Sequence, residues 1–530
     1  MKETILLALF VLLGGAVWFA AAGEPEIPVV ASGVVTAPVD ENEETGDAPA
    51  GFERFFDEGD RLAEEKKYQE ALNSWTQGYL LLLPQYRGLK FERSVNVDFM
   101  SKETLRRFLI DDVKREYPDV EIKADELFYI HLGFAEPSLD LKALVLDVLT
   151  EQVAGFYDPR DKHLNLIRIE PKPEDKKSVL EKLFQIGDAF EPSEQKATLA
   201  HELAHALADQ KYDLYSMQRS IETDEDALLA LSALIEGEAM LVMMMDSMAV
   251  SADQRQSFLA KAEQFSRAMQ VLESFGSFFS DDVLANAPLV VREALLFPYV
   301  KGMSFCAHLT ASGDWSRVDG AFRQPPVSTE QILHPKKFLA ESRDDPTQLQ
   351  FSQSTIRLGP DWELLKENVL GEFGIEVLLR EQVGKKVSRR AAAGWDGDLY
   401  RLYGRRTKSD SGGEVDETFL VWASTWDSET EAIEFVRAAA KHLGVADAES
   451  VSAPPGLPKS EHVWSGARGV SVLIRRAEDV WLIDRCPQGS LVAVSEWALD
   501  ITKSPKIFEL QTFKAQKPVE AGGELAPSAK

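Results

Sequence analysis

The chain has 530 residues, of which 45% are hydrophobic and 27% charged. This composition is ordinary for a globular protein, and the length corresponds to about two to four domains. The formal net charge of −29 repels the phosphates of nucleic acid, so we exclude nucleic acid as a partner.

The N-terminal segment is apolar from Ile5 to Ala22 and ends in small residues, with Ala20 and Ala22 in an A-x-A arrangement. This pattern is typical of a signal peptide, here residues 1–22, and predicts an exported protein that is periplasmic or secreted. The run is also almost long enough to cross a bilayer, so an uncleaved membrane anchor through residues 4–22 is the alternative.

Residues 23–50 are rich in Pro, Gly, Ala and acids without any period, which predicts a flexible linker. Residues 51–87 are predicted to form a helical hairpin that ends at Pro84. Since repeat arrays need about three units and we find one, the hairpin is expected to cap the next domain. Its small and aromatic residues have the spacing of a tetratricopeptide unit: Gly59, Leu62, Tyr68, Ala71, Trp75 and Gly78.

Residues 88–344 are predicted to form one mostly helical domain, interrupted by a turn at 155–159 that leads into an alternating strand at 162–168. The predicted helices that follow cover about 176–186, 194–210 and 224–250, the last of them apolar on nearly every side.

Residues 345–514 are predicted to form an antiparallel α+β domain, and residues 515–530 a disordered tail. Trp395, Trp422 and Trp426 are expected to pack across strands, with ligand binding as the alternative. The predicted strands are 399–405, 419–426, 470–475 and 480–484, and the predicted helices are 362–381, 430–443 and 490–501. Cys306 and Cys486 are expected to be buried free thiols, with a disulfide as the alternative.

His201, Glu202 and His205 form an HExxH motif inside the predicted helix 194–210. Residues four apart lie on one helix face, about 5.4 Å apart along the axis, so both imidazoles can reach one zinc ion. Glu202 is rotated by about 100° from His201, which lets its carboxylate act as a base instead of a ligand. A chance match on a solvated helix is the alternative, and the Ala- and Leu-rich surroundings argue against it.

The residues around the motif bear on how the helix is placed. Leu199, Leu203 and Leu207 form a stripe opposite the histidines, which predicts that the helix packs into a core and leaves its histidine face toward a cleft. Asp209 lies one turn beyond His205 and is a candidate to orient its ring by a hydrogen bond.

Zinc needs a third protein ligand if one coordination position is to stay open for water. Glu236 and Glu238 lie about 200° apart on the predicted helix 224–250, so only one of them can face the metal. Small neighbours let the Glu236 face approach the HExxH helix closely, which favours Glu236, with Glu238 as the alternative. Both could instead be buried hydrogen-bonding groups, but two carboxylates in so apolar a segment are costly without a cation.

The stretches TLAHELAHALADQ (198–210) and ALIEGEAM (233–240) together resemble the gluzincin branch of the zincin metallopeptidases. The chain is similar to a group of largely uncharacterised bacterial metallopeptidases, with further shared stretches at 155–167, 296–305 and 325–335. The resemblance implies a zincin-like fold for the helical domain, and it implies that the glutamate before the Gly of E-G-x-A, here Glu236, is the third ligand.

The sequence departs from this family at one position. Several gluzincins place an acid four residues after the third ligand, where it supports a histidine; here that position is Met240, so Asp209 or another acid must give that support. The resemblance also implies that the strand 157–169 is the sheet edge before the active-site helix and that an extended substrate pairs with it.

Peptide hydrolysis also needs a hydrogen-bond donor to the oxyanion. The candidates are His334, which lies in a Pro-bounded loop, Tyr299, His308 and Tyr157. A packing role is the alternative for His334 and for Tyr299, and the sequence does not choose among the four.

The sequence thus predicts an α+β protein with a TPR-like hairpin, a mostly helical zincin-like domain with a small edge sheet, and an antiparallel α+β domain. Its expected function is hydrolysis of a peptide or protein substrate by water activated by one zinc ion per chain, with Glu202 as general base and then general acid. The ligands would be His201, His205 and Glu236. The alternative is an exported or membrane-anchored interaction scaffold with a structural or vestigial metal site.

Overall fold

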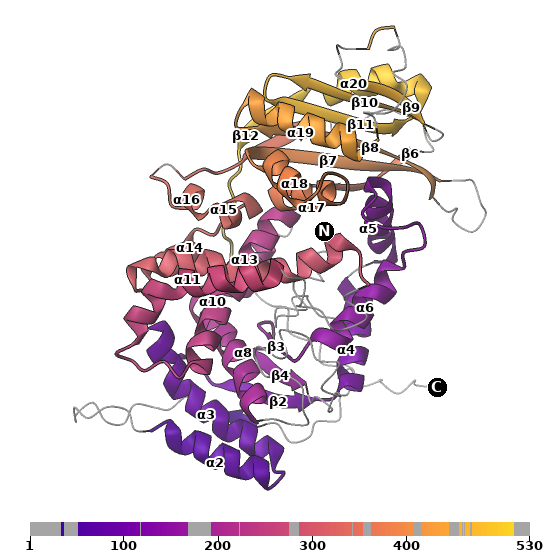
Figure 1. Ribbon diagram of the computed structural model, residues 1–530. Helices are drawn as coiled ribbons and strands as arrows, with labels where there is room; N and C mark the ends of the chain where they lie inside the picture. The colour runs from indigo at the N-terminus through magenta and orange to yellow at the C-terminus, as the bar shows by residue number, and fades with distance from the viewer. Residues whose placement is uncertain are drawn as a thin grey trace, which may run out of the picture.

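Figure 1 shows a computed structural model of the protein, in which a body of helices with a small sheet lies below a larger C-terminal sheet. The structure is α+β, as predicted. The signal peptide, most of the linker, the helix predicted at 176–186 and the tail 515–530 lie outside the described residues. The structure describes residues 33–35, 51–116, 118–167, 192–221, 223–274, 286–341, 343–352, 362–406, 415–444, 455–457, 459, 462–466 and 469–512.

Most of the described chain before residue 345 is helical. The helices are α2 (Glu53–Glu64), α3 (Tyr68–Arg87), α4 (Lys102–Glu116), α5 (Asp119–Leu132), α6 (Leu141–Gln152), α8 (Pro192–Tyr212), α9 (Leu214–Ile221), α10 (Glu225–Ser247), α11 (Arg255–Ser274), α13 (Leu289–Leu309), η2 (Thr310–Ser312), α14 (Ser316–Arg323), α15 (Thr329–Leu333) and α16 (Pro335–Phe338).

Helices α2 and α3 form the predicted hairpin and pack on α8 (Figure 1). Gly59 lets the two helices close, because a Cβ at this residue would lie 2.3 Å from the ring of Trp75. The prediction that Pro84 ends the hairpin is wrong, since α3 continues to Arg87. A proline removes one helical hydrogen bond, but burial of the last turn, including Arg87, holds the helix together.

A four-stranded sheet lies beside these helices in the order β1-β2-β4-β3, with β2 and β4 parallel and the other pairs antiparallel. The predicted strand 162–168 is β4, but 155–159 forms a strand of its own instead of a turn. The sheet edge is therefore β3, and β4 lies inside the sheet. Residues 33–35, within the expected linker, also form a strand, which pairs with β2 and is the other edge of the sheet. The strands are β1 (Gly33–Val35), β2 (Val95–Met100), β3 (Gly155–Asp158) and β4 (His163–Ile167).

Helix α10 is the central helix of the body. It begins at Asp224, whose side chain accepts a hydrogen bond from the backbone N–H of Ala227. Among the described residues it is the one helix long and apolar enough to cross a membrane, but 94% of its most apolar window is buried inside the protein. Burial by α8 and α13 accounts for its apolar character on nearly every side.

Helices α10 and α13 approach each other at two glycines. A Cβ on Gly237 would lie 2.1 Å from the carbonyl group of Gly302, and a Cβ on Gly302 would lie 2.0 Å from the carbonyl oxygen of Ala233. The glycine of the E-G-x-A stretch therefore serves the contact with α13. The predicted approach of the Glu236 face to the HExxH helix is present as well, since α10 also packs against α8.

The C-terminal sheet is antiparallel throughout, in the order β6-β7-β8-β11-β10-β9. Helices α17 to α19 cover one face, while α20 and the two-stranded sheet β12-β5 pack on the other. These elements are β5 (Thr347–Phe351), β6 (Trp362–Asn368), α17 (Gly371–Val383), α18 (Lys385–Ala392), β7 (Trp395–Arg406), β8 (Val415–Trp426), α19 (Glu429–His442), β9 (His462–Gly466), β10 (Gly469–Arg476), β11 (Asp479–Cys486), η4 (Gln488–Ser490), α20 (Leu491–Ala498) and β12 (Ile501–Pro505).

One helix prediction in this domain is wrong, and another is correct apart from its C-terminal end. The predicted helix 362–381 is strand β6 followed by α17, because Gly371 has a φ of 72° and begins a new element. The predicted helix 490–501 stops at Ala498, and Ile501 starts β12. The four predicted strands are present as β7, β8, β10 and β11.

The aromatic residues and cysteines of the chain behave as predicted. Trp395, Trp422 and Trp426 are buried, and their ring N–H groups donate to Asp398 or Ser424 inside the sheet. The two cysteines are buried free thiols. These residues therefore contribute packing.

The α10–α13 crossing predicts a strong effect of one methyl group. Gly237→Ala should lower the free energy of unfolding by about 3 kcal/mol or more, because the added Cβ meets a backbone that no rotamer change can move. Denaturant unfolding measures this, with Gly320→Ala as the control, since a Cβ at Gly320 meets nothing within 4 Å. Equal stability of the two variants would contradict the crossing.

Candidate metal centre

The HExxH motif lies in the middle of α8, which packs against α3, β3 and α10. The predicted leucine stripe is fully buried. The two histidines are buried as well, with 8% of His201 and 1% of His205 exposed. The histidine face therefore meets α10.

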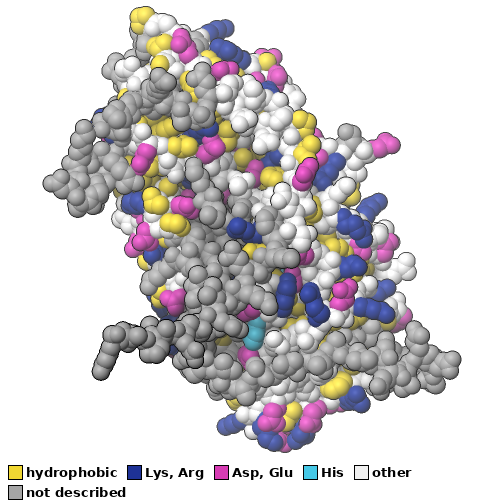
Figure 2. All heavy atoms as spheres, turned by 180° about the vertical axis from the view of Figure 1, so that it is seen from behind, with side chains coloured by type: hydrophobic (Ala, Val, Ile, Leu, Met, Phe, Trp, Pro, Cys, Tyr) yellow, Lys and Arg dark blue, Asp and Glu magenta, His cyan; other side chains and the backbone are white. Residues whose placement is uncertain are grey.

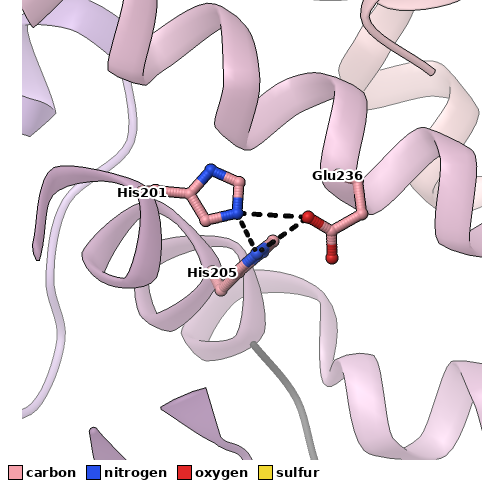
Figure 3. A group of neighbouring side chains, drawn as sticks. All are labelled: His201, His205 and Glu236. Carbon is pink, nitrogen blue, oxygen red and sulfur yellow. Dashed lines mark hydrogen bonds and ion pairs between the residues drawn. The ribbon is translucent and has the colours of Figure 1, made fainter. Parts of the chain in front are cut away.

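Figure 3 shows both histidines turned toward Glu236 of α10. Nε2 of His201 lies 3.1 Å from Oε2 of Glu236 and 3.0 Å from Nε2 of His205. Nε2 of His205 lies 3.4 Å from the same carboxylate oxygen. In the part of the chain that the structure describes, these are the His, Cys, Asp or Glu side chains that bring three ligand atoms within 4.8 Å of one another.

The dimensions and chemistry of this cluster fit a zinc ion. Ligand atoms about 2.0–2.1 Å from a tetrahedral zinc lie about 3.3 Å apart, so the three atoms match one face of such a site. Burial alone would raise the pKa of Glu236, but the two histidines outweigh burial and lower it. Glu236 is therefore a carboxylate, and a carboxylate with two imidazoles is a ligand set that zinc binds.

The second glutamate of the pair points elsewhere. Glu238 is fully buried, and its Oε1 accepts a hydrogen bond from Nε of Arg87. Helix geometry predicts that only one of the two glutamates faces the histidines, and in the structure this residue is Glu236. Arg87 is a residue that the sequence did not reveal, because nothing in the pattern of α3 marks an arginine as buried.

Glu202 lies beside the cluster and not in it. Its Oε2 accepts a hydrogen bond from the backbone N–H of Tyr157, at 2.9 Å. Burial raises the pKa of Glu202 to about 7, with a further raising effect of Glu236 and an opposing effect of His201. A carboxyl group with a pKa near neutrality can both accept and return a proton.

Asp209 does not orient His205. Its Oδ2 accepts hydrogen bonds from the hydroxyl of Tyr157, at 2.9 Å, and from Nζ of Lys162, at 2.8 Å. The Nδ1 atoms of His201 and His205 are buried and have no hydrogen-bond partner among the described residues. Asp209 therefore holds α8 against the β3–β4 hairpin, and the ring support that we expected from it is absent.

The four candidate donors to an oxyanion lie in different surroundings. The ring of Tyr299 is 6.3 Å from that of His201, centroid to centroid. The hydroxyl of Tyr157 is taken by Asp209, His308 faces Glu263, and Nε2 of His334 lies 2.9 Å from Glu372. Tyr299 is thus the candidate that the structure brings to the cluster.

The edge strand β3 is close to the cluster through its backbone. Tyr157 lies on the edge, and its outward N–H is already bound by Glu202. An extended substrate that pairs with this edge would find no free donor at residue 157. The sequence could place the strand beside the motif, but it could not show that the two share a hydrogen bond.

A cavity of about 330 Å³ lies apart from the cluster, where the start of α10 meets the C-terminal sheet. Its lining includes Asp224, Asn368, Arg401 and Lys506, together with Trp395, for which ligand binding is the alternative prediction, and none of the residues predicted for the metal site. The two buried cations already have partners, because Arg401 pairs with Glu367 and Lys506 with Asp224. We therefore assign no ligand to this cavity.

Comparison with known proteins concerns the C-terminal sheet. Residues 362–492 match a family described as a domain of unknown function (DUF8575). No curated protein and no solved structure matches the chain. The family match begins at β6 and ends in α20, so it does not include the residues of the metal cluster.

Proposed function

We propose that this protein is a zinc-dependent peptidase with His201, His205 and Glu236 as the metal ligands and Glu202 as the general base. The observation that carries the proposal is the triangle of three ligand atoms with sides of 3.0 to 3.4 Å, with Glu202 held just outside it. These three residues are also the ligands that the resemblance to gluzincins implies.

Zinc in this site would polarise the scissile carbonyl and lower the pKa of a water molecule. The chain itself supplies the proton transfers. Glu202 would take a proton from the attacking water and later give it to the leaving amine. The N–H of Tyr157 fixes the position of Glu202, because it binds one carboxylate oxygen and leaves the other to turn toward the substrate.

Tyr299 is proposed as the donor to the oxyanion. Burial raises the pKa of Tyr299 well above its ordinary value, and the charges of Glu236 and Glu202 raise it further. Its hydroxyl therefore keeps its proton and can donate a hydrogen bond. A donor of this kind acts on charge that develops in the transition state.

The remaining parts of the proposal come from the sequence. The zincin-like fold of the body, the TPR-like nature of the hairpin, export through residues 1–22 and a peptide or protein substrate belong to it. The alternative, a scaffold with a structural or vestigial metal site, does not explain Glu202, since a structural site needs no buried carboxyl beside its ligands.

Metal content and activity of point variants test the site. We expect about one zinc per chain in the wild type and in Glu202→Gln, and little zinc in His205→Ala or Glu236→Ala, because only the last two remove a ligand. Glu202→Gln should reduce kcat on a peptide library about 10²- to 10⁴-fold, the usual contribution of a general base.

His308→Ala is the matched control, since this histidine faces Glu263 outside the cluster and should leave zinc content unchanged. Wild-type protein that stays free of zinc after reconstitution would refute the metal site. Full zinc content without peptidase activity would support the scaffold instead.

Substitution of Tyr299 tests the oxyanion donor. Tyr299→Phe should reduce kcat about 10²- to 10³-fold with little change in KM or zinc content, because it removes a hydrogen bond made only in the transition state. Steady-state kinetics measure this, with Tyr403→Phe in the C-terminal sheet as the control. A kcat equal to that of the control would exclude Tyr299 from the reaction.

A further inference from the structure

Arg87, the last residue of α3, is a buried cation with 1% of its surface exposed. Its Nε lies 2.5 Å from Oε1 of Glu238, and a terminal nitrogen lies 2.6 Å from Oδ1 of Asp319. The guanidinium carbon is 4.7 Å from the ring centre of Trp315, a cation–π contact. Burial opposes the charge of Arg87, but the two carboxylates outweigh burial and raise its pKa, so the side chain stays charged.

The partners of Arg87 connect it to both helices that carry the metal cluster. Glu238 lies two residues after Glu236 on α10. Asp319 accepts a second hydrogen bond, at 2.8 Å, from the hydroxyl of Tyr212, which is the last residue of α8. The planar fork of a guanidinium can bind two carboxylates at once, whereas a lysine offers one point charge. One residue of the hairpin thus joins α8 and α10.

The contact with Glu238 also sets the rotation of α10 about its axis. Residues two apart point in directions that differ by about 200°, so Glu236 faces the histidines when Glu238 faces Arg87. Turning Glu238 toward the histidines would break this buried ion pair and leave Arg87 with the carboxylate of Asp319 alone, which is unfavourable. The ion pair therefore selects the glutamate that reaches the metal.

We propose that Arg87 is a positioning residue of the metal centre and that the hairpin α2–α3 is part of the catalytic unit. Arg87 contacts none of the three ligands and acts through Glu238 and Asp319. This inference rests on the proposed zinc site, and it gives the hairpin a role other than peptide binding.

The test is the zinc dissociation constant of the full chain, measured by competition with a chromogenic chelator. Arg87→Met should weaken zinc binding about 10- to 100-fold, the usual effect of losing a residue that orients ligands. Arg87→Lys should give a smaller loss, because one ammonium cannot hold both carboxylates. Arg61→Met is the control, since Arg61 lies in the same hairpin with 51% of its side chain exposed.

Stability is separated from positioning by measuring the thermal midpoint of each zinc-free variant. A variant that is folded at the temperature of the titration has a site in nearly every molecule, so weaker binding reports the geometry of the site. If Arg87→Met does not fold, Arg87→Met/Glu238→Gln removes the unpaired carboxylate. This double variant should still bind zinc about 10-fold more weakly, because Arg87 no longer links α10 to Asp319.

The outcomes distinguish the inference from the function on which it rests. Wild type that binds no zinc overturns both. Tight zinc binding by the wild type together with an unchanged dissociation constant in a folded Arg87 variant overturns the role of Arg87 alone. The same holds if Arg61→Met weakens zinc binding as much as Arg87→Met.

Discussion

Burying a carboxylate in a helix as apolar as α10 costs free energy unless a cation or several donors compensate its charge. At Glu236 the two histidines of α8 face the carboxylate, and their Nε2 atoms and its Oε2 atom lie 3.0 to 3.4 Å from one another. At Glu238 the compensation is Arg87. The charges of two neighbouring carboxylates are thus compensated by different partners. This difference separates the proposed metal ligand, Glu236, from Glu238, which forms a structural ion pair.

Helix α10 is held along its length by the C-terminal domain, by α13 and by the hairpin. The C-terminal domain binds its first turn, where Lys366 and Asn368 contact Glu225 and Lys506 contacts Asp224. Helix α13 meets its middle at paired glycines, and the hairpin meets it through Arg87. A site that needs ligand atoms placed to within a few tenths of an ångström requires such support. The domain of unknown function therefore contributes contacts to the helix of Glu236 without lining the cluster.

Much of the site could be predicted because it depends on local spacing. The HExxH interval and the angle between Glu236 and Glu238 follow from helix geometry alone, and the buried strands β7, β8, β10 and β11 from their composition. Contacts between distant segments could not be predicted in this way. Which elements face each other in the fold decides three features of the site. These are the hydrogen bonds of Asp209 with Tyr157 and Lys162, the glycine contact of α10 with α13, and the burial of Arg87. The periodicity of a single sequence does not contain this information. The helix predicted over β6 failed because tertiary pairing with β7 outweighed local preference.

X-ray absorption at the zinc edge of the metal-loaded full chain tests the central claim most directly, since it reports the ligands themselves. The cluster of His201, His205 and Glu236 predicts about four nitrogen or oxygen ligands near 2.0 Å, with outer scattering from two imidazoles. Glu236→Ala should change this shell, and His308→Ala, which alters a residue outside the cluster, should leave it intact. A shell of oxygens without imidazole scattering, or a sulfur ligand at about 2.3 Å from Cys306 or Cys486, would contradict the proposed site.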